Sequence, residues 1–241
     1  MHPVGRFDTT QWSLVLRAGG GTPDARAALA TLCSTYRPAV LAYIRSRGHD
    51  ADVAQDLTQA FFTRFLEHAT YANADPARGR FRAFLLTAIK RFLINAEEEA
   101  HAAKRGGRIH FESIDTAATD ILPTDAETPD HAFERAWALV ALEAALRRLR
   151  DEAQAAGKRE LFDRLRDFLT EAPDEADYAR VAATLNLRRN TLAVAVHRLR
   201  HRLRELVREE LAQTIADRAE LDVELREMRG ALGSVLQAAT Q

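Results

Sequence analysis

The chain is poor in the features that mark secreted and membrane-spanning proteins. Its 241 residues include a single cysteine, Cys33, so no disulfide can form within the chain. No stretch approaches the roughly 18 continuous apolar residues of a membrane span, and residues 1–11 lack the apolar core of a secretory signal. We therefore expect a cytoplasmic protein that does not contact a membrane.

Alternation of apolar and polar residues, which marks half-buried β-strands, is also absent from the sequence. Ala, Leu, Arg and Glu, which are strong helix formers, are abundant. A content of 46% apolar and 29% charged residues is typical of a folded protein and excludes disorder throughout the chain. The sequence therefore predicts an all-α fold.

Residue patterns for catalysis or for holding a cofactor are missing as well. The eight histidines have no zinc-ligand spacing; His197 and His201 lie four residues apart, but among arginines that would repel a cation. Residues 19–21 are three glycines without the Lys-Ser/Thr of a phosphate-binding loop. Cys33 lies in an apolar helical pattern, which favours packing over reactivity. We therefore predict no enzyme activity, no catalytic residue, no metal site and no cofactor.

The most informative segment that is present runs from Asp177 to Arg208. Its apolar residues are spaced by four and three positions, as on one stripe of a helix: Leu192, Val196, Leu199, Leu203 and Leu206. From Arg188 to Arg208 there are seven arginines and one glutamate, a formal charge of +6 in a chain of net charge −1. Asn186 suits the left-handed turn before this helix. The segment predicts a helix-turn-helix for the DNA major groove; the alternative is a helix whose arginines are only solvated.

Three helices are expected before this segment, over Pro23–Arg47, Asp50–Ala69 and Arg80–Ala103. The second carries a polar stripe with little basic character, which suits a protein partner better than DNA: Asp52, Asp56, Gln59 and Thr63. The third has a phenylalanine-rich face, which we assign to the core, and a mostly basic outer face. The sequence therefore predicts an uncharged or anionic outer face on the second helix and a cationic outer face on the third.

An acidic segment divides the chain. Residues 111–134 contain seven acidic residues and no Lys or Arg, and Pro123 and Pro129 interrupt this stretch. We predict two helical domains joined by an acidic linker. The expected parts are an N-terminal extension (1–21), a first helical domain (22–105), the linker (106–130), a helix-turn-helix domain (131–211) and a C-terminal helical tail (212–241).

These features together resemble the bacterial RNA polymerase sigma factors of the extracytoplasmic-function (ECF) type, over roughly residues 10–211. Asp56-Leu-Thr-Gln-Ala-Phe-Phe62 is similar to the segment that docks on the polymerase β′ clamp helices. Phe81-Arg-Ala-Phe-Leu85 is similar to the start of the helix that opens and reads the minus-ten element. Tyr178–Leu185, followed by Thr191–Arg202, is similar to the reader of minus-thirty-five DNA. The resemblance implies that the two domains correspond to sigma regions 2 and 4.

Some positions depart from the pattern of that family. Ala60 stands where a Glu is usual, Lys90 and Arg91 stand where an Arg-Asn pair is usual, and Ala193 replaces a frequent Lys. Residues 97–99 are three glutamates where basic residues are common. We therefore expect an unusual minus-ten preference and one contact fewer at the minus-thirty-five element.

The resemblance implies core RNA polymerase (β′ clamp helices and β flap) and promoter DNA as partners, with an anti-sigma protein as an optional third. The polymerase-docking residues would be Asp52, Asp56, Gln59 and Thr63. The minus-ten strand would be engaged by Arg82, Lys90, Arg91 and Asn95. The upstream major groove would be read by Arg188, Arg189, Asn190, Val194, His197 and Arg198.

The expected function is therefore a sigma factor that binds core polymerase and directs promoter recognition and opening. Two other classes stay open at this point. One is a helix-turn-helix transcription regulator that binds duplex DNA without polymerase, and the other is a helical interaction protein whose arginines are surface residues only.

Overall fold

The computed structural model describes residues 23–75, 80–106, 128–171, 173–212 and 220–233, except for the side chains of 101–106. Within these ranges the regular elements are helices, and no strand occurs, which confirms the all-α fold class. The predicted N-terminal extension and most of the predicted acidic linker lie outside the described residues.

The first half of the chain forms three long helices, α2 (Pro23–Ser46), α3 (Ala51–Glu67) and α4 (Phe81–Gly106), with a short 3₁₀ helix, η1 (Thr70–Asn73), between the last two. These bounds agree with the expected helices to within a few residues. Local chemistry explains the ends. Gly48 has a φ of 92° just past α2. Asp50 caps α3, because its carboxylate accepts a hydrogen bond from the Val53 N–H at 2.8 Å.

Aromatic side chains from these helices form the core of the first half. The Phe61 and Phe92 rings lie edge to face with centroids 5.5 Å apart, and the Tyr36 and Phe81 rings do so at 5.4 Å. Phe61, Phe81 and Phe92 are buried. Rings at these positions therefore belong to the core, as predicted, and are not exposed for stacking on a strand of nucleic acid.

The second half contains α5 (Pro129–Ala155), α6 (Arg159–Leu165), α7 (Asp167–Thr170), α8 (Glu175–Thr184), α9 (Arg189–Ala212) and α10 (Leu221–Leu232). Thr128 caps α5 by accepting a hydrogen bond from the His131 N–H at 3.2 Å. Helices α6 and α7 follow each other directly and are separated at Arg166.

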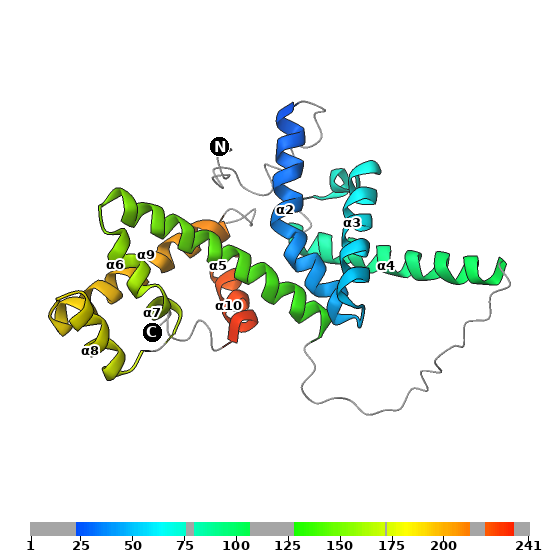
Figure 1. The fold of residues 1–241 in the computed structure, drawn as a ribbon. Coiled ribbons are helices and arrows are strands. Elements are labelled where there is room, and N and C mark those ends of the chain that lie inside the picture. The colour runs from blue at the N-terminus through cyan, green and yellow to red at the C-terminus, as the bar shows by residue number, and fades with distance from the viewer. Residues whose placement is uncertain (1–22, 76–79, 107–127, 172, 213–219, 234–241) are drawn as a thin grey trace.

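Helix α5 joins the two halves (Figure 1). It packs against α2 and α10 as well as against α6 and α9. Phe133 and Trp137 on α5 are 0% and 2% exposed and belong to one cluster that also contains Tyr36 of α2 and Leu203 of α9. We expected two helical domains joined by an acidic linker; within the described residues, one hydrophobic cluster contains side chains of both halves. The physical reason is the apolar surface of Phe133 and Trp137, which needs burial against a second helix.

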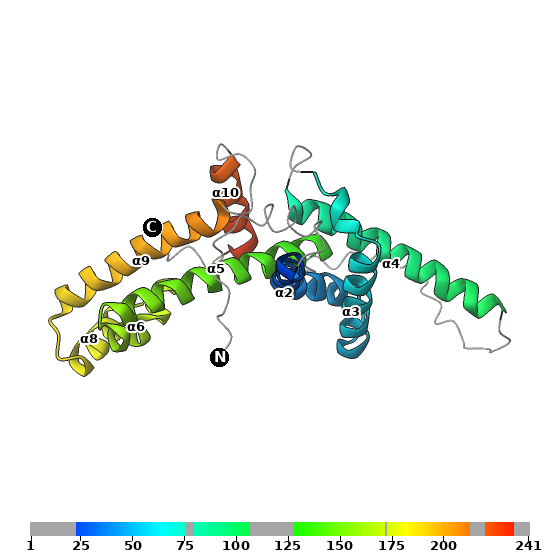
Figure 2. The same cartoon turned by 90° about the horizontal axis from the view of Figure 1, so that it is seen from above.

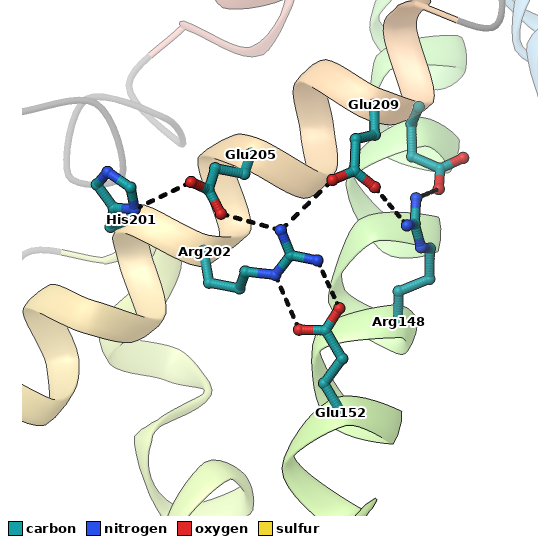
Figure 3. A network of polar contacts seen from close by, with 7 residues as sticks. Arg148, Glu152, His201, Arg202, Glu205 and Glu209 are labelled. Atoms are coloured by element: carbon teal, nitrogen blue, oxygen red, sulfur yellow. Dashed lines mark hydrogen bonds and ion pairs between the residues drawn. The ribbon is translucent and has the colours of Figure 1, made fainter.

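A polar network fastens α9 to the far half of α5 (Figure 3). Arg202 donates to both carboxylate oxygens of Glu152, at 2.7 and 2.9 Å, and also to Glu205 at 2.9 Å. The hydrogen bond from Arg202 lowers the pKa of Glu152. Arg148 of α5 reaches Glu209 and Glu210 of α9, at 2.5 and 2.7 Å. These charged side chains hold two helices together instead of facing a partner.

Candidate functional site

Helices α8 and α9 are joined by a tight bend. Asn186 has a φ of 52°, the left-handed conformation predicted for this position, and the Leu187 N–H bonds back to the Ala182 carbonyl at 2.9 Å. A capping box between Asp174 and Asp177 begins α8. A separate small core fixes the angle between the helices and consists of Leu165, Phe168, Ala182, Leu192 and Val196.

The left-handed turn gives a first testable prediction. Asn186→Ala is expected to lower the free energy of unfolding by about 1 kcal/mol, because alanine has no side-chain amide to offset the clash of its Cβ at positive φ. Urea unfolding followed by circular dichroism measures the effect. Asn186→Gly is the matched control and is expected to keep or raise the midpoint. Equal midpoints for the alanine and glycine variants would contradict the turn described here.

The beginning of α9 is the exposed part of this helix pair. All six residues predicted to read the major groove are exposed: Arg188, Arg189, Asn190, Val194, His197 and Arg198. Val194 is 50% exposed, which is high for an apolar side chain. Arg189 makes an ion pair with Glu175 at 2.5 Å across the exposed surface. The structure thus brings these six side chains together on the first three turns of one helix.

Three other arginines of α9 have structural contacts. Arg200 donates to the Phe168 carbonyl at 2.7 and 2.9 Å and to the Glu171 carbonyl at 2.8 Å, which satisfies the end of α7. Arg208 pairs with Asp222 of α10 at 2.9 Å, and Arg202 belongs to the network of Figure 3. The positive field inferred from the sequence is therefore concentrated at the beginning of α9. One feature of the sequence could have predicted the contacts of Arg200. It follows the buried Val196 by four residues, so it lies on the same side of the helix.

A cavity of about 670 Å³ lies between α3, η1 and α4. Its apolar wall includes Phe61, Phe65, Phe84 and Phe92. Its polar lining includes Arg64, Arg80, Thr87, Arg91 and Asn95, and so contains two of the residues predicted for the minus-ten strand. Lys90, a third, is exposed and pairs with Asp130 of α5 at 2.7 Å.

Arg82, the fourth residue predicted for that strand, is buried. It is 3% exposed, donates from Nε to Glu134 at 2.8 Å, and places its guanidinium 4.4 Å from the centre of the Trp137 ring. It also pairs with Glu224 and Glu227 of α10. In this conformation Arg82 is not accessible to DNA, because α5 and α10 cover the start of α4.

The polar stripe of α3 is exposed over its whole length, at Asp52, Asp56, Gln59 and Thr63. A shallow groove of about 290 Å³ beside it is lined by residues of α2 and α3: Cys33, Ser34, Arg37, Gln59, Phe62, Thr63 and Leu66. Burial raises the pKa of Cys33 to about 11, so its thiol stays protonated at neutral pH. This face combines carboxylates, amide and hydroxyl groups with some apolar surface, which suits a protein partner.

The described residues contain no group of three or more His, Cys, Asp or Glu side chains placed to hold a metal ion. Among the helices described, none combines the length and apolar character needed to cross a membrane.

Comparison with known protein families found a match within the first half of the chain. Residues 32–99, which extend from the middle of α2 into α4, match the family model of sigma-70 region 2. Neither the curated proteins nor the solved structures contain a significant match to the chain. The α3 stripe and the cavity beside α4 both lie within the matched residues. The match supports a sigma-70 family sigma factor, which acts in RNA polymerase binding and transcription initiation.

Proposed function

We propose that the protein is an ECF-type sigma factor that binds core RNA polymerase in the cytoplasm and directs promoter recognition and opening. The observation that carries the proposal is the match to sigma-70 region 2 over helices that present an exposed polar stripe and a cavity with a basic rim. The exposed, positively charged beginning of α9 supports a second DNA contact on the same chain. An anti-sigma protein is an optional regulator of such a factor.

The α3 stripe would dock on the β′ clamp helices. Asp52 and Asp56 are exposed, and neither carboxylate forms an ion pair with another of the described residues. Both charges are therefore available to a basic partner. Gln59 and Thr63 continue the same face toward the groove on α2. The second domain, predicted over residues 131–211, would contact the β flap.

Promoter opening would use the cavity beside α4. The partly buried Phe84 in its wall can contact the face of a base, and Arg91 and Asn95 can bond to base edges or phosphate oxygens. Taking one base out of the stack costs a few kcal/mol, and stacking contributes about 1–3 kcal/mol per base. Opening therefore requires binding energy and no enzyme chemistry. The minus-ten contacts proposed for the conformation described here are Lys90, Arg91 and Asn95.

The beginning of α9 would lie in the major groove of the minus-thirty-five element, as the second helix of a helix-turn-helix. Arg188, Arg189 and Asn190 can donate to purine edges or phosphates, and Val194 can contact a thymine methyl group. His197 and Arg198 extend this surface along the same face. The ion pair between Arg189 and Glu175 is exposed, so exchanging it for phosphate costs little.

Run-off transcription tests the proposal directly. Purified protein is added to core polymerase on fragmented genomic DNA, and promoter-specific transcripts are expected only when both are present. Footprinting by the chain alone at moderate salt, without such transcripts, would instead support the regulator that acts without polymerase. Absence of both transcripts and footprints would leave the interaction protein as the remaining class.

A point variant refines the test of α9. Arg198→Ala is expected to weaken binding of the holoenzyme to the minus-thirty-five element by about 1–3 kcal/mol if the side chain reads a base. Arg26→Ala, which removes an exposed arginine from α2, is the matched control and is expected to leave binding unchanged. Quantitative band-shift assays on wild-type and scrambled elements separate base reading from phosphate contact. Equal affinities for the two arginine variants would remove Arg198 from the interface.

A further inference from the structure

Helix α10 is seated where α4 begins and α9 ends, as the view from above shows (Figure 2). It packs against α5 and α9, and its Met228 and Leu232 are buried in the common core. Asp222 ties it to Arg208 at the end of α9. A helix from the C-terminal part of the chain therefore connects elements of both halves.

Two glutamates of α10 bind the two arginines at the start of α4. Glu224 is 0% exposed and pairs with Arg80 at 3.0 Å and also with Arg82. Glu227 pairs with Arg82 at 2.5 Å and also with Arg80. The two glutamates are one turn apart, at positions three residues from each other, so both face α4 at once. Each arginine is therefore shared between the two carboxylates of α10.

Arg80 also lines the cavity beside α4. With Glu134 included, the cluster contains two arginines and three glutamates, a formal charge of −1 that repels phosphate. Without α10 the same place would contain two arginines and one glutamate, a formal charge of +1 beside the cavity. Carboxylate and phosphate present similar acceptor oxygens to a guanidinium fork, so each can replace the other.

We propose that α10 is an autoinhibitory helix whose Glu224 and Glu227 occupy a nucleic-acid phosphate site formed by Arg80 and Arg82, until polymerase and promoter displace it. This inference rests on the proposed function. A helix of twelve residues is marginal in water by itself, so α10 depends on its packing and can be lost as one unit. Its departure would expose Arg80, free Arg82 from two of its carboxylate partners and separate the start of α4 from the end of α9.

Binding of the free, full-length chain to a fluorescein-labelled single-stranded 12-mer, followed by anisotropy at low salt, provides the first test. Glu227→Gln is expected to tighten binding at least about fivefold, because one of the competing carboxylates is removed. Glu220→Gln makes the same charge change at an exposed residue of the same segment and is expected to change binding less than twofold. Glu227 is exposed, so its variant is expected to retain the fold, which a thermal melt verifies.

Equal affinity gains for Glu227→Gln and Glu220→Gln would show that the effect comes from the change in net charge alone, and would overturn the proposal. No detectable binding by either variant would overturn it as well. The comparison needs no polymerase, so it decides the inference even if the chain proves not to be a sigma factor.

Hydrogen exchange of residues 221–232 gives the second test. Addition of core polymerase and a promoter fragment is expected to raise exchange in this segment at least about tenfold, whereas α5 stays protected. Unchanged protection of α10 in a complex that co-elutes as holoenzyme would overturn autoinhibition. Failure to co-elute would count against the proposed function instead, and the anisotropy comparison would then decide the role of α10.

Discussion

Replacing Arg82 by methionine is expected to destabilise the protein by about 3–5 kcal/mol. Glu224 is completely buried, and removal of Arg82 takes away one of the two arginines that pair with its charge, the other being Arg80 at 3.0 Å. Glu134 loses the hydrogen bond that partly offsets its burial; burial already raises the pKa of this carboxyl. Contact of the guanidinium with the Trp137 ring is lost as well. Denaturant unfolding at neutral pH measures the change.

Two further variants decide whether the buried charge is the cause. Arg91→Met removes an exposed arginine from the same helix and is expected to change stability by less than about 0.5 kcal/mol. The double variant Arg82→Met/Glu224→Leu removes both charges and is expected to recover most of the loss, because apolar residues of similar volume can replace a buried pair. Equal losses for the single and double variants would show that packing, and not charge, dominates at this position.

Asp56→Arg is expected to weaken binding to core polymerase at least about 100-fold, which corresponds to about 2.7 kcal/mol. The residue is exposed in the middle of the α3 stripe, so the substitution leaves the core intact. Reversal of its charge would bring two positive groups together at a basic docking surface, which costs several kcal/mol. Co-elution of the variant with core polymerase on a sizing column, followed by a competition assay, measures the loss.

Asp24→Arg is the matched control for this substitution. Asp24 is exposed on α2 and is not part of the α3 stripe, so the variant makes the same change of charge outside the proposed docking face. Its binding to polymerase is expected to stay within about twofold of the unchanged protein. Retained binding by Asp56→Arg, with an unchanged thermal melt, would count against α3 as the docking helix.

Much of the secondary structure follows from local sequence. The bounds of α2, α3 and α4 lie close to those expected, because caps, glycine and apolar periodicity act within a few residues along the chain. The left-handed turn at Asn186 is also a local feature, because residue type alone predicts it. Exposure of the α3 stripe and of the beginning of α9 also follows from periodicity, because a side chain opposite a buried stripe faces solvent.

Contacts between distant helices decided the roles of particular charges. Arg82 and Arg91 were both expected to engage the minus-ten strand, yet Arg82 is buried under α5 and α10 while Arg91 lines the cavity. Arg198 and Arg200 differ in the same way, because the end of α7 lies beside only one of them. The number of charges along a helix does not tell which arginine of each pair packs against a neighbouring helix.

The sequence by itself determined the helices, their buried stripes and the match to sigma-70 region 2 over residues 32–99. Only the tertiary structure decided that α5 would join both halves in one core and that α10 would place Glu224 and Glu227 on Arg80 and Arg82. The physical reason is the separation along the chain of the residues that interact. Helix formation depends on neighbours within four residues, whereas the pairing of a buried charge depends on which remote helix covers it.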